Sequence, residues 1–95
     1  MTAMPQERAP GSPFWVSLGV ELRAARTGKG MKQATMARHL NVARPTIAQY
    51  EKAAQRIPID RLIRWCLFVD IDPAELMGRL TERHPELKDR KARET

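Results

Sequence analysis

From residue 14 onward, apolar side chains recur at the spacing of an α-helix, with charged residues between them. Leu18, Leu22 and Ala25 follow one another at intervals of four and three positions, so they share one face of a helix. The two glycines at 28 and 30 end this pattern. The first predicted element is therefore a helix that stops at about Gly28.

Four further helices are predicted beyond this point. Residues 32–40 and 44–52 form two short helices, and a connection of only three or four residues forces them to cross at a steep angle. A fourth helix starts near Ile59. The stretch Asp72-Pro73-Ala74-Glu75 predicts the start of a fifth, with an Asp cap, Pro at the first helical position and Glu closing a capping box. No alternating strand pattern or internal repeat occurs, so the fold class is all-α.

The 95 residues are enough for one domain and too few for two separate cores. Residues 1–13 contain three prolines and few apolar groups, so we expect a disordered arm there. The folded domain is predicted over residues 14–80, and residues 81–95, which are mostly charged, are expected to be a tail or a frayed helix. Without a membrane span or a signal peptide, a cytoplasmic, nucleoid-associated protein is expected.

Excess positive charge is concentrated in the first half of the predicted domain. The net charge is +6, and residues 14–52 carry seven basic against two acidic side chains. A one-sided basic surface is typical of proteins that bind a polyanion, because Lys and Arg displace the counterions of phosphates. The alternative is a basic face that serves only solubility, and charge alone does not decide between the two.

Few residues are available for chemistry. The single cysteine, Cys66, cannot form an internal disulfide, and His39 and His84 are too few to complete a zinc site, so no metal or cofactor is expected. The acidic residues are scattered, with neither a phosphate-binding glycine loop nor a nucleophile beside a base. An enzyme is therefore rejected, and Cys66 is expected to be a core residue.

Three segments together resemble the Cro/repressor (XRE-type) family of helix-turn-helix DNA-binding regulators. These segments are Gln33-Ala34-Thr35-Met36-Ala37, Leu40-Asn41-Val42 and Thr46-Ile47-Ala48-Gln49-Tyr50-Glu51. The resemblance extends from about Leu18 to Met77 and implies a five-helix, lambda-repressor-like domain. Ala37 must then be small where two helices meet, Val42 and Ile47 fill the junction, and Glu51 pairs with Arg23 or Arg26 on the first helix.

The resemblance also implies that the third helix enters the major groove of duplex DNA. Base-reading positions are then Ala43, Arg44, Pro45 and Gln49. Arginine can bond guanine through two atoms and glutamine can do so with adenine. DNA-backbone contacts are expected from Lys29, Lys32, Gln33, Arg38, Thr46 and Lys52.

Two features depart from the family pattern. Lys32 and Ala43 stand where a Ser or Thr would usually cap the second and third helices. Asn41 and Ala53 stand where glycine is common, and a left-handed backbone suits Asn better than Ala.

One such domain reads only a few base pairs, so a homodimer on a pseudo-palindromic operator is expected. The candidate dimer residues are in or near the fifth helix: Ile71, Leu76, Met77 and Leu80, with Leu87 or the Phe14-Trp15 pair as further candidates. Packing into the core of the single chain is the alternative for these residues. The predicted function is that of a repressor or autoregulator of transcription. The alternative is an antitoxin or another partner-binding protein of a mobile element, whose charged C-terminal tail holds a protein partner. RNA binding is less favoured, because the domain lacks a surface of aromatic side chains for stacking bases.

Overall fold

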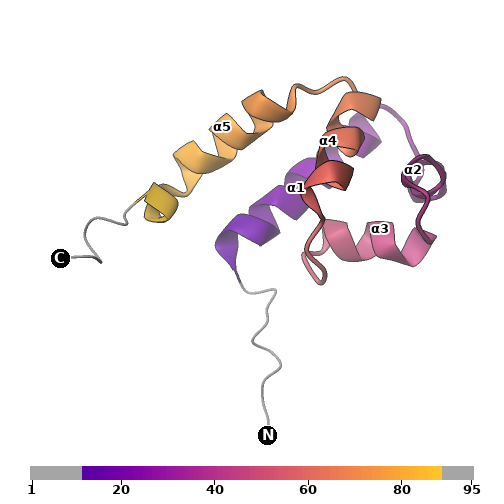
Figure 1. The fold of residues 1–95 in the computed structure, drawn as a ribbon, viewed down its shortest axis with the longest axis horizontal. Helices are drawn as coiled ribbons and strands as arrows, with labels where there is room; N and C mark the ends of the chain where they lie inside the picture. Colours follow the sequence, from indigo (N-terminus) through magenta and orange to yellow (C-terminus); the bar gives the residue numbers. More distant parts are fainter. Residues whose placement is uncertain (1–11, 89–95) are drawn as a thin grey trace, which may run out of the picture.

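A computed structural model of the chain describes residues 12–88 and shows an all-α fold, as predicted (Figure 1). Residues 1–11 of the arm expected at 1–13, and residues 89–95 of the expected tail, lie outside the described residues. The last residue of the expected arm, Pro13, is instead the first residue of the first α-helix. The described part contains five α-helices and one 3-10 helix: α1 (Pro13–Gly28), α2 (Gln33–Leu40), α3 (Arg44–Glu51), α4 (Ile59–Phe68), α5 (Pro73–Arg83) and η2 (Pro85–Lys88).

The helices pack around one apolar core. In Figure 1, α1 crosses the centre, α2 and α3 lie together on one side of it, and α5 extends on the other side. Each of the five α-helices contributes buried side chains, because each has large apolar residues three or four positions apart on one face. The main core residues are Leu18, Leu22, Met36, Ala37, Leu40, Ile47, Tyr50, Ile57, Leu62, Trp65, Cys66, Val69, Leu76 and Leu80.

Trp65 is the largest fully buried side chain and joins α4 to α1. Its indole Nε1 donates a hydrogen bond of 3.2 Å to the carbonyl oxygen of Leu22, so its polar atom is satisfied inside the core. Cys66 is next to it and is also buried. Burial raises the pKa of the Cys66 thiol, which keeps it protonated, as expected of a structural cysteine.

The C-terminal part of the fold is bound to α1. Glu21 on α1 forms ion pairs with Arg79, at 3.2 Å, and with Arg83 on α5. The hydrogen bond from Arg83, followed by that from Arg79, lowers the pKa of Glu21. After α5, the buried His84 places its Nε2 2.8 Å from the hydroxyl of Ser17. Residues 81–88 therefore continue the folded domain, where a tail or frayed helix was expected to begin at residue 81.

The helix ends agree with most of the expected capping. Asp72 accepts a hydrogen bond of 2.9 Å from the amide of Ala74 at the start of α5. The return bond from Glu75 that would complete a capping box is not among the hydrogen bonds of residues 12–88. Lys32 and Ala43 provide no side-chain cap to α2 and α3, as predicted.

Gly19 allows α1 to approach the end of α3 closely. A Cβ atom at this position would lie 2.4 Å from the carbonyl oxygen of Glu51, which is too short for any real contact. Only glycine therefore permits the two backbones to lie this close together. Because Glu51 belongs to α3, Gly19 helps to fix the position of that helix.

Candidate nucleic-acid interface

A short turn sets the angle between α2 and α3. Asn41 adopts the left-handed conformation, with φ of 58° and ψ of 48°, as the sequence suggested. The next amide, that of Val42, donates a 3.0 Å hydrogen bond back to the carbonyl of Ala37. The half-buried Val42 side chain packs against the core, with Ile47 of α3 fully buried nearby. Two helices joined in this way form a helix-turn-helix.

The outer face of α3 carries the residues expected to read bases. Ala43, Arg44, Pro45 and Gln49 are all exposed. Ile47 and Tyr50 point into the core from the opposite face of the same helix. The structure therefore places these four positions together on an open surface, where a ligand can reach them.

A buried ion pair anchors the end of α3 to α1. The Nε atom of Arg26 donates to Oε2 of Glu51 at 2.5 Å, and its Nη2 donates to Oε1 at 3.1 Å. Arg26 is 6% exposed and Glu51 is 9% exposed. The remaining nitrogen of Arg26, Nη1, donates to the carbonyl oxygen of Met31 at 2.6 Å. Of the two partners proposed for Glu51, the structure selects Arg26, while Arg23 is exposed beside it.

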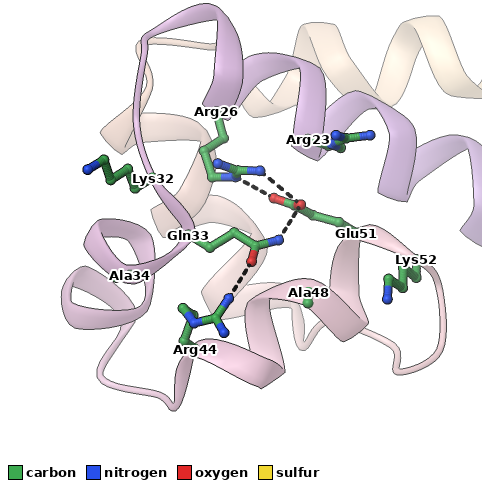
Figure 2. A pocket seen from close by; sticks show the side chains of 9 residues that line it. All are labelled: Arg23, Arg26, Lys32, Gln33, Ala34, Arg44, Ala48, Glu51 and Lys52. Carbon is green, nitrogen blue, oxygen red and sulfur yellow. Dashed lines mark hydrogen bonds and ion pairs between the residues drawn. The ribbon is translucent and has the colours of Figure 1, made fainter.

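Gln33 links this ion pair by hydrogen bonds to Arg44 at the exposed start of α3. Its Nε2 donates to Oε1 of Glu51 at 3.1 Å, and its Oε1 accepts a hydrogen bond of 3.1 Å from Nη1 of Arg44. Figure 2 shows the resulting chain of side chains from Arg26 through Glu51 and Gln33 to Arg44. The amide of Gln33 thus holds the guanidinium of Arg44 at the exposed start of α3.

The same side chains line a hollow of about 650 Å³ between the end of α1, the start of α2 and α3. It is lined by Arg23, Arg26, Lys32, Gln33, Ala34, Arg44, Ala48, Glu51 and Lys52. Five of these residues are basic, and the only acid among them, Glu51, is bonded to Arg26. The surface of this hollow is therefore strongly positive.

A second hollow, of about 620 Å³, lies on the other side of the start of α2. It is lined by Lys29, Gly30, Met31, Lys32, Ala34, Thr35 and Arg38. Lys32 and Ala34 belong to both hollows. The uncapped start of α2 is thus flanked by basic side chains on both sides.

Most of the residues predicted to contact the DNA backbone line the two hollows, and Arg23 lines the first hollow with them. Lys32, Gln33 and Lys52 line the first hollow, while Lys29 and Arg38 line the second. Thr46 is half-buried on α3 and lines neither. Arg23, which was considered only as a partner of Glu51, is an exposed cation on the rim of the first hollow. The sequence could have indicated this position, because residues three apart on a helix are neighbours on its surface and Arg23 lies three residues before Arg26.

The residues predicted to form a dimer surface are mostly inside the molecule. Leu76 and Leu80 are buried, and Ile71 and Met77 are half-buried against the same core. The reason is that α5 packs on α1 and α4, so its apolar face is needed to close the core of a single chain. Leu87 remains exposed.

The fold and this basic surface together define the class of the protein, a helix-turn-helix DNA-binding regulator. A family model described as helix-turn-helix matches residues 22–76, which is more than half of the chain. The chain therefore belongs to this XRE-type helix-turn-helix family. The matched residues include the whole turn between α2 and α3 and the side chains that line both hollows.

A solved structure supports the same classification. The chain is similar to the restriction-modification controller protein C.AhdI from Aeromonas hydrophila, with 29% sequence identity and a TM-score of 0.60. The similarity covers 65% of this chain and 94% of the controller protein. A search among curated proteins gave no match. Within residues 12–88, none of the helices has the length and apolar character needed to cross a membrane.

Proposed function

We propose that the chain is a sequence-specific regulator of transcription that binds duplex DNA as a homodimer, with α3 in the major groove. The observation that carries this proposal is the placement of Arg44 at the exposed start of α3, fixed by Gln33 and flanked by basic hollows. The similarity to a restriction-modification controller protein supports a regulatory role, which we propose to be that of a repressor or autoregulator.

Arg44 has suitable geometry for reading a guanine. Its guanidinium carries five N–H donors, and the bond to Gln33 occupies one of them. The others remain to bond O6 and N7 of guanine, a pairing that discriminates by about 1–3 kcal/mol. A side chain that is already held in place loses less conformational entropy on binding than a free one.

The phosphates beside the groove have partners in the two hollows. Lys32 just before α2, Arg38 on α2 and Lys52 just after α3 provide positive charge in the two hollows. The uncapped start of α2 adds backbone amides, and a helix N-terminus favours an anion. These contacts supply affinity and set the orientation of the domain, while the exposed face of α3 supplies specificity.

The role of the C-terminal tail as a partner-binding segment stays a prediction. Residues 81–88 are folded against α1, through the bonds of Arg83 and His84, which leaves residues 89–95 as the segment that such a partner could bind. An antitoxin-like function is therefore not favoured by any contact among the described residues.

The proposal is tested by selecting bound duplexes from a random pool and measuring the affinity of variants for the selected site. Arg44→Ala should weaken binding by about 1–3 kcal/mol and relax the preference at one base pair. Lys32→Ala should weaken binding to all duplexes equally and reduce the slope of log affinity against log salt by about one unit.

Arg79→Ala removes a cation from α5, outside both hollows, and serves as the control for charge. It should leave the preferred base unchanged and alter the salt slope least. Equal behaviour of Arg44→Ala and Lys32→Ala, or no selected sequence at all, would contradict the proposal.

A further inference from the structure

The exposed start of α3 is apolar on both sides of Arg44. Ala43 precedes this arginine and Pro45 follows it, and both side chains are exposed. Neither side chain has an atom that donates or accepts a hydrogen bond. Ala48, one helical turn after Arg44, is half-buried and lines the first hollow with it. Arg44 is therefore the one hydrogen-bonding side chain in the stretch 43–45.

The backbone at this helix start adds few hydrogen-bonding groups. Proline has no amide hydrogen, so Pro45 cannot donate to a base. The amide of Thr46 is already used, because it donates a 2.9 Å hydrogen bond to the carbonyl oxygen of Ala43. A base edge that approaches the start of α3 therefore contacts the hydrocarbon groups of Ala43 and Pro45 beside the guanidinium of Arg44.

The hydrogen bond to Gln33 limits how far Arg44 can extend from the helix. Nη1 of Arg44 is 3.1 Å from Oε1 of Gln33, and Figure 2 shows the guanidinium turned toward that amide. A base that bonds a guanidinium held in this way must come close to the start of α3. The short side chains next to Arg44 then reach a neighbouring base pair, because consecutive Cα atoms are about 3.8 Å apart and base pairs about 3.4 Å apart.

One group that bases present in the major groove is apolar. It is the methyl group at C5 of thymine, and 5-methylcytosine carries the same group. Contact with Ala43 or Pro45 removes the apolar surface of this methyl group from water, which favours binding. Uracil and unmethylated cytosine have a hydrogen atom at C5, so they lose this contact. The apolar start of α3 therefore favours a pyrimidine with a C5 methyl group beside the guanine.

From these observations we infer that Pro45 reads the C5 methyl group of the pyrimidine in a base pair next to the guanine bonded by Arg44. Pro45 is favoured over Ala43 because its ring presents the larger apolar surface. It also lies four residues before Gln49, so the two are neighbours on the exposed face of α3. The pyrimidine is thymine or 5-methylcytosine. The inference rests on the proposed function, because it requires α3 to lie in the major groove.

The inference is tested on the site selected from random duplexes, in the two base pairs next to the guanine whose preference Arg44→Ala relaxes. Four duplexes carry thymine, uracil, 5-methylcytosine or cytosine there, each with its complementary base, and fluorescence anisotropy measures their affinities. At one of the two positions, thymine should bind about four-fold more tightly than uracil, and 5-methylcytosine about four-fold more tightly than cytosine, as expected for burial of one methyl group. The tighter of the two methylated duplexes identifies the pyrimidine that the protein reads.

Two variants show whether Pro45 makes this contact. Pro45→Glu replaces the ring with a carboxylate that can accept a hydrogen bond from N4 of cytosine, so the preference for the methyl group should be lost. A glutamate in the first turn also suits the helix dipole, so α3 should still form. Ala74→Glu adds the same charge at an exposed residue of α5, outside both hollows, and should keep the four-fold preference. Circular dichroism checks that both variants are folded.

The preference is a ratio of affinities measured with one protein, so a general loss of affinity caused by the added charge cancels. Equal binding of thymine and uracil, and of the two cytosines, at both positions would overturn the inference and leave the proposed function intact. A methyl preference that persists in Pro45→Glu would also overturn it, because another residue would then read the methyl group. If selection yields no preferred sequence, the proposed function fails and the inference fails with it.

Discussion

At the scale of single residues, Arg26, Glu51, Gln33 and Arg44 link the core to the exposed start of α3. The ion pair between Arg26 and Glu51 is buried, so each charge depends on the other for the solvation it has lost. Gln33 uses both ends of its amide, donating to Glu51 and accepting from Arg44. A substitution at the buried end of this chain of bonds should therefore lower the free energy of unfolding of the domain.

We predict that Glu51→Gln destabilises the domain by about 3 kcal/mol or more, because it leaves the charge of Arg26 buried without a counter-ion. Chemical denaturation measures the loss. The matched control is Glu21→Gln, which removes a carboxylate with two arginine partners near the surface and should cost at most about 1 kcal/mol. Equal losses of stability for the two variants would show that burial does not increase the contribution of the Arg26–Glu51 pair to stability.

The sequence could predict only part of this arrangement. The resemblance implied a basic partner for Glu51 on the first helix, and Arg26 fills that role. It also implied a DNA-backbone contact for Gln33, but the bond from Arg44 to Gln33 depends on the rotamers of both side chains, which no spacing rule specifies. Arg23 and Arg26 were equivalent candidates because both lie near the end of the same helix.

At the scale of helices, the position of α3 depends on a close contact with α1 that only glycine permits. The backbone of Gly19 faces the carbonyl oxygens of Tyr50 and Glu51 at the end of α3. Gly78, in contrast, lies within α5 with no atom near the place of a Cβ. The same substitution at the two glycines should therefore have opposite effects.

Gly19→Ala is expected to destabilise the domain by about 1–3 kcal/mol, since the new methyl group must displace the backbone of α3. Gly78→Ala is expected to stabilise it by about 0.5–1 kcal/mol, because alanine favours the helix interior. Thermal unfolding of the two variants gives the comparison. Stabilisation by both would show that α1 and α3 are not in close contact at Gly19.

The helix boundaries were predictable, because periodic apolar residues, the Asp72 cap and Asn41 are local signals. The close approach at Gly19 was not, since it joins residues more than thirty positions apart and a glycine within a helix has no distinctive pattern. Ala53 adopts a φ of 61° although alanine disfavours it, which shows that tertiary packing overrides local preference at the turn after α3.

At the scale of the whole molecule, the folded chain has a basic side formed by α2, α3 and the end of α1. Residues 14–52 have two acidic side chains, and both are paired: Glu51 with Arg26, and Glu21 with arginines of α5. The basic side chains of this half of the sequence that line the two hollows therefore have no further acidic side chain of residues 14–52 to offset their charge. The sequence predicted this asymmetry correctly, because it depends on composition and on which helices lie together.

The use of α5 shows what composition cannot predict. Leu76 and Leu80 were candidates for a dimer surface, but they close the core of the single chain. On α4, the apolar residues Ile59, Ile63 and Leu67 are exposed. Their exposure depends on how α4 is oriented on the core, which the sequence pattern does not specify. Whether an apolar face meets the same chain or another depends on packing that periodicity does not determine.

The contact between Arg44 and a guanine edge is measured most directly by replacing guanines of the selected site, one at a time, with 7-deazaguanine, which lacks the N7 acceptor. At one position per half-site, the replacement should weaken binding of the natural chain clearly and leave the weaker binding of Arg44→Ala unchanged, because the partner of N7 is already absent. If every replacement weakens both proteins equally, Arg44 does not read guanine in the major groove.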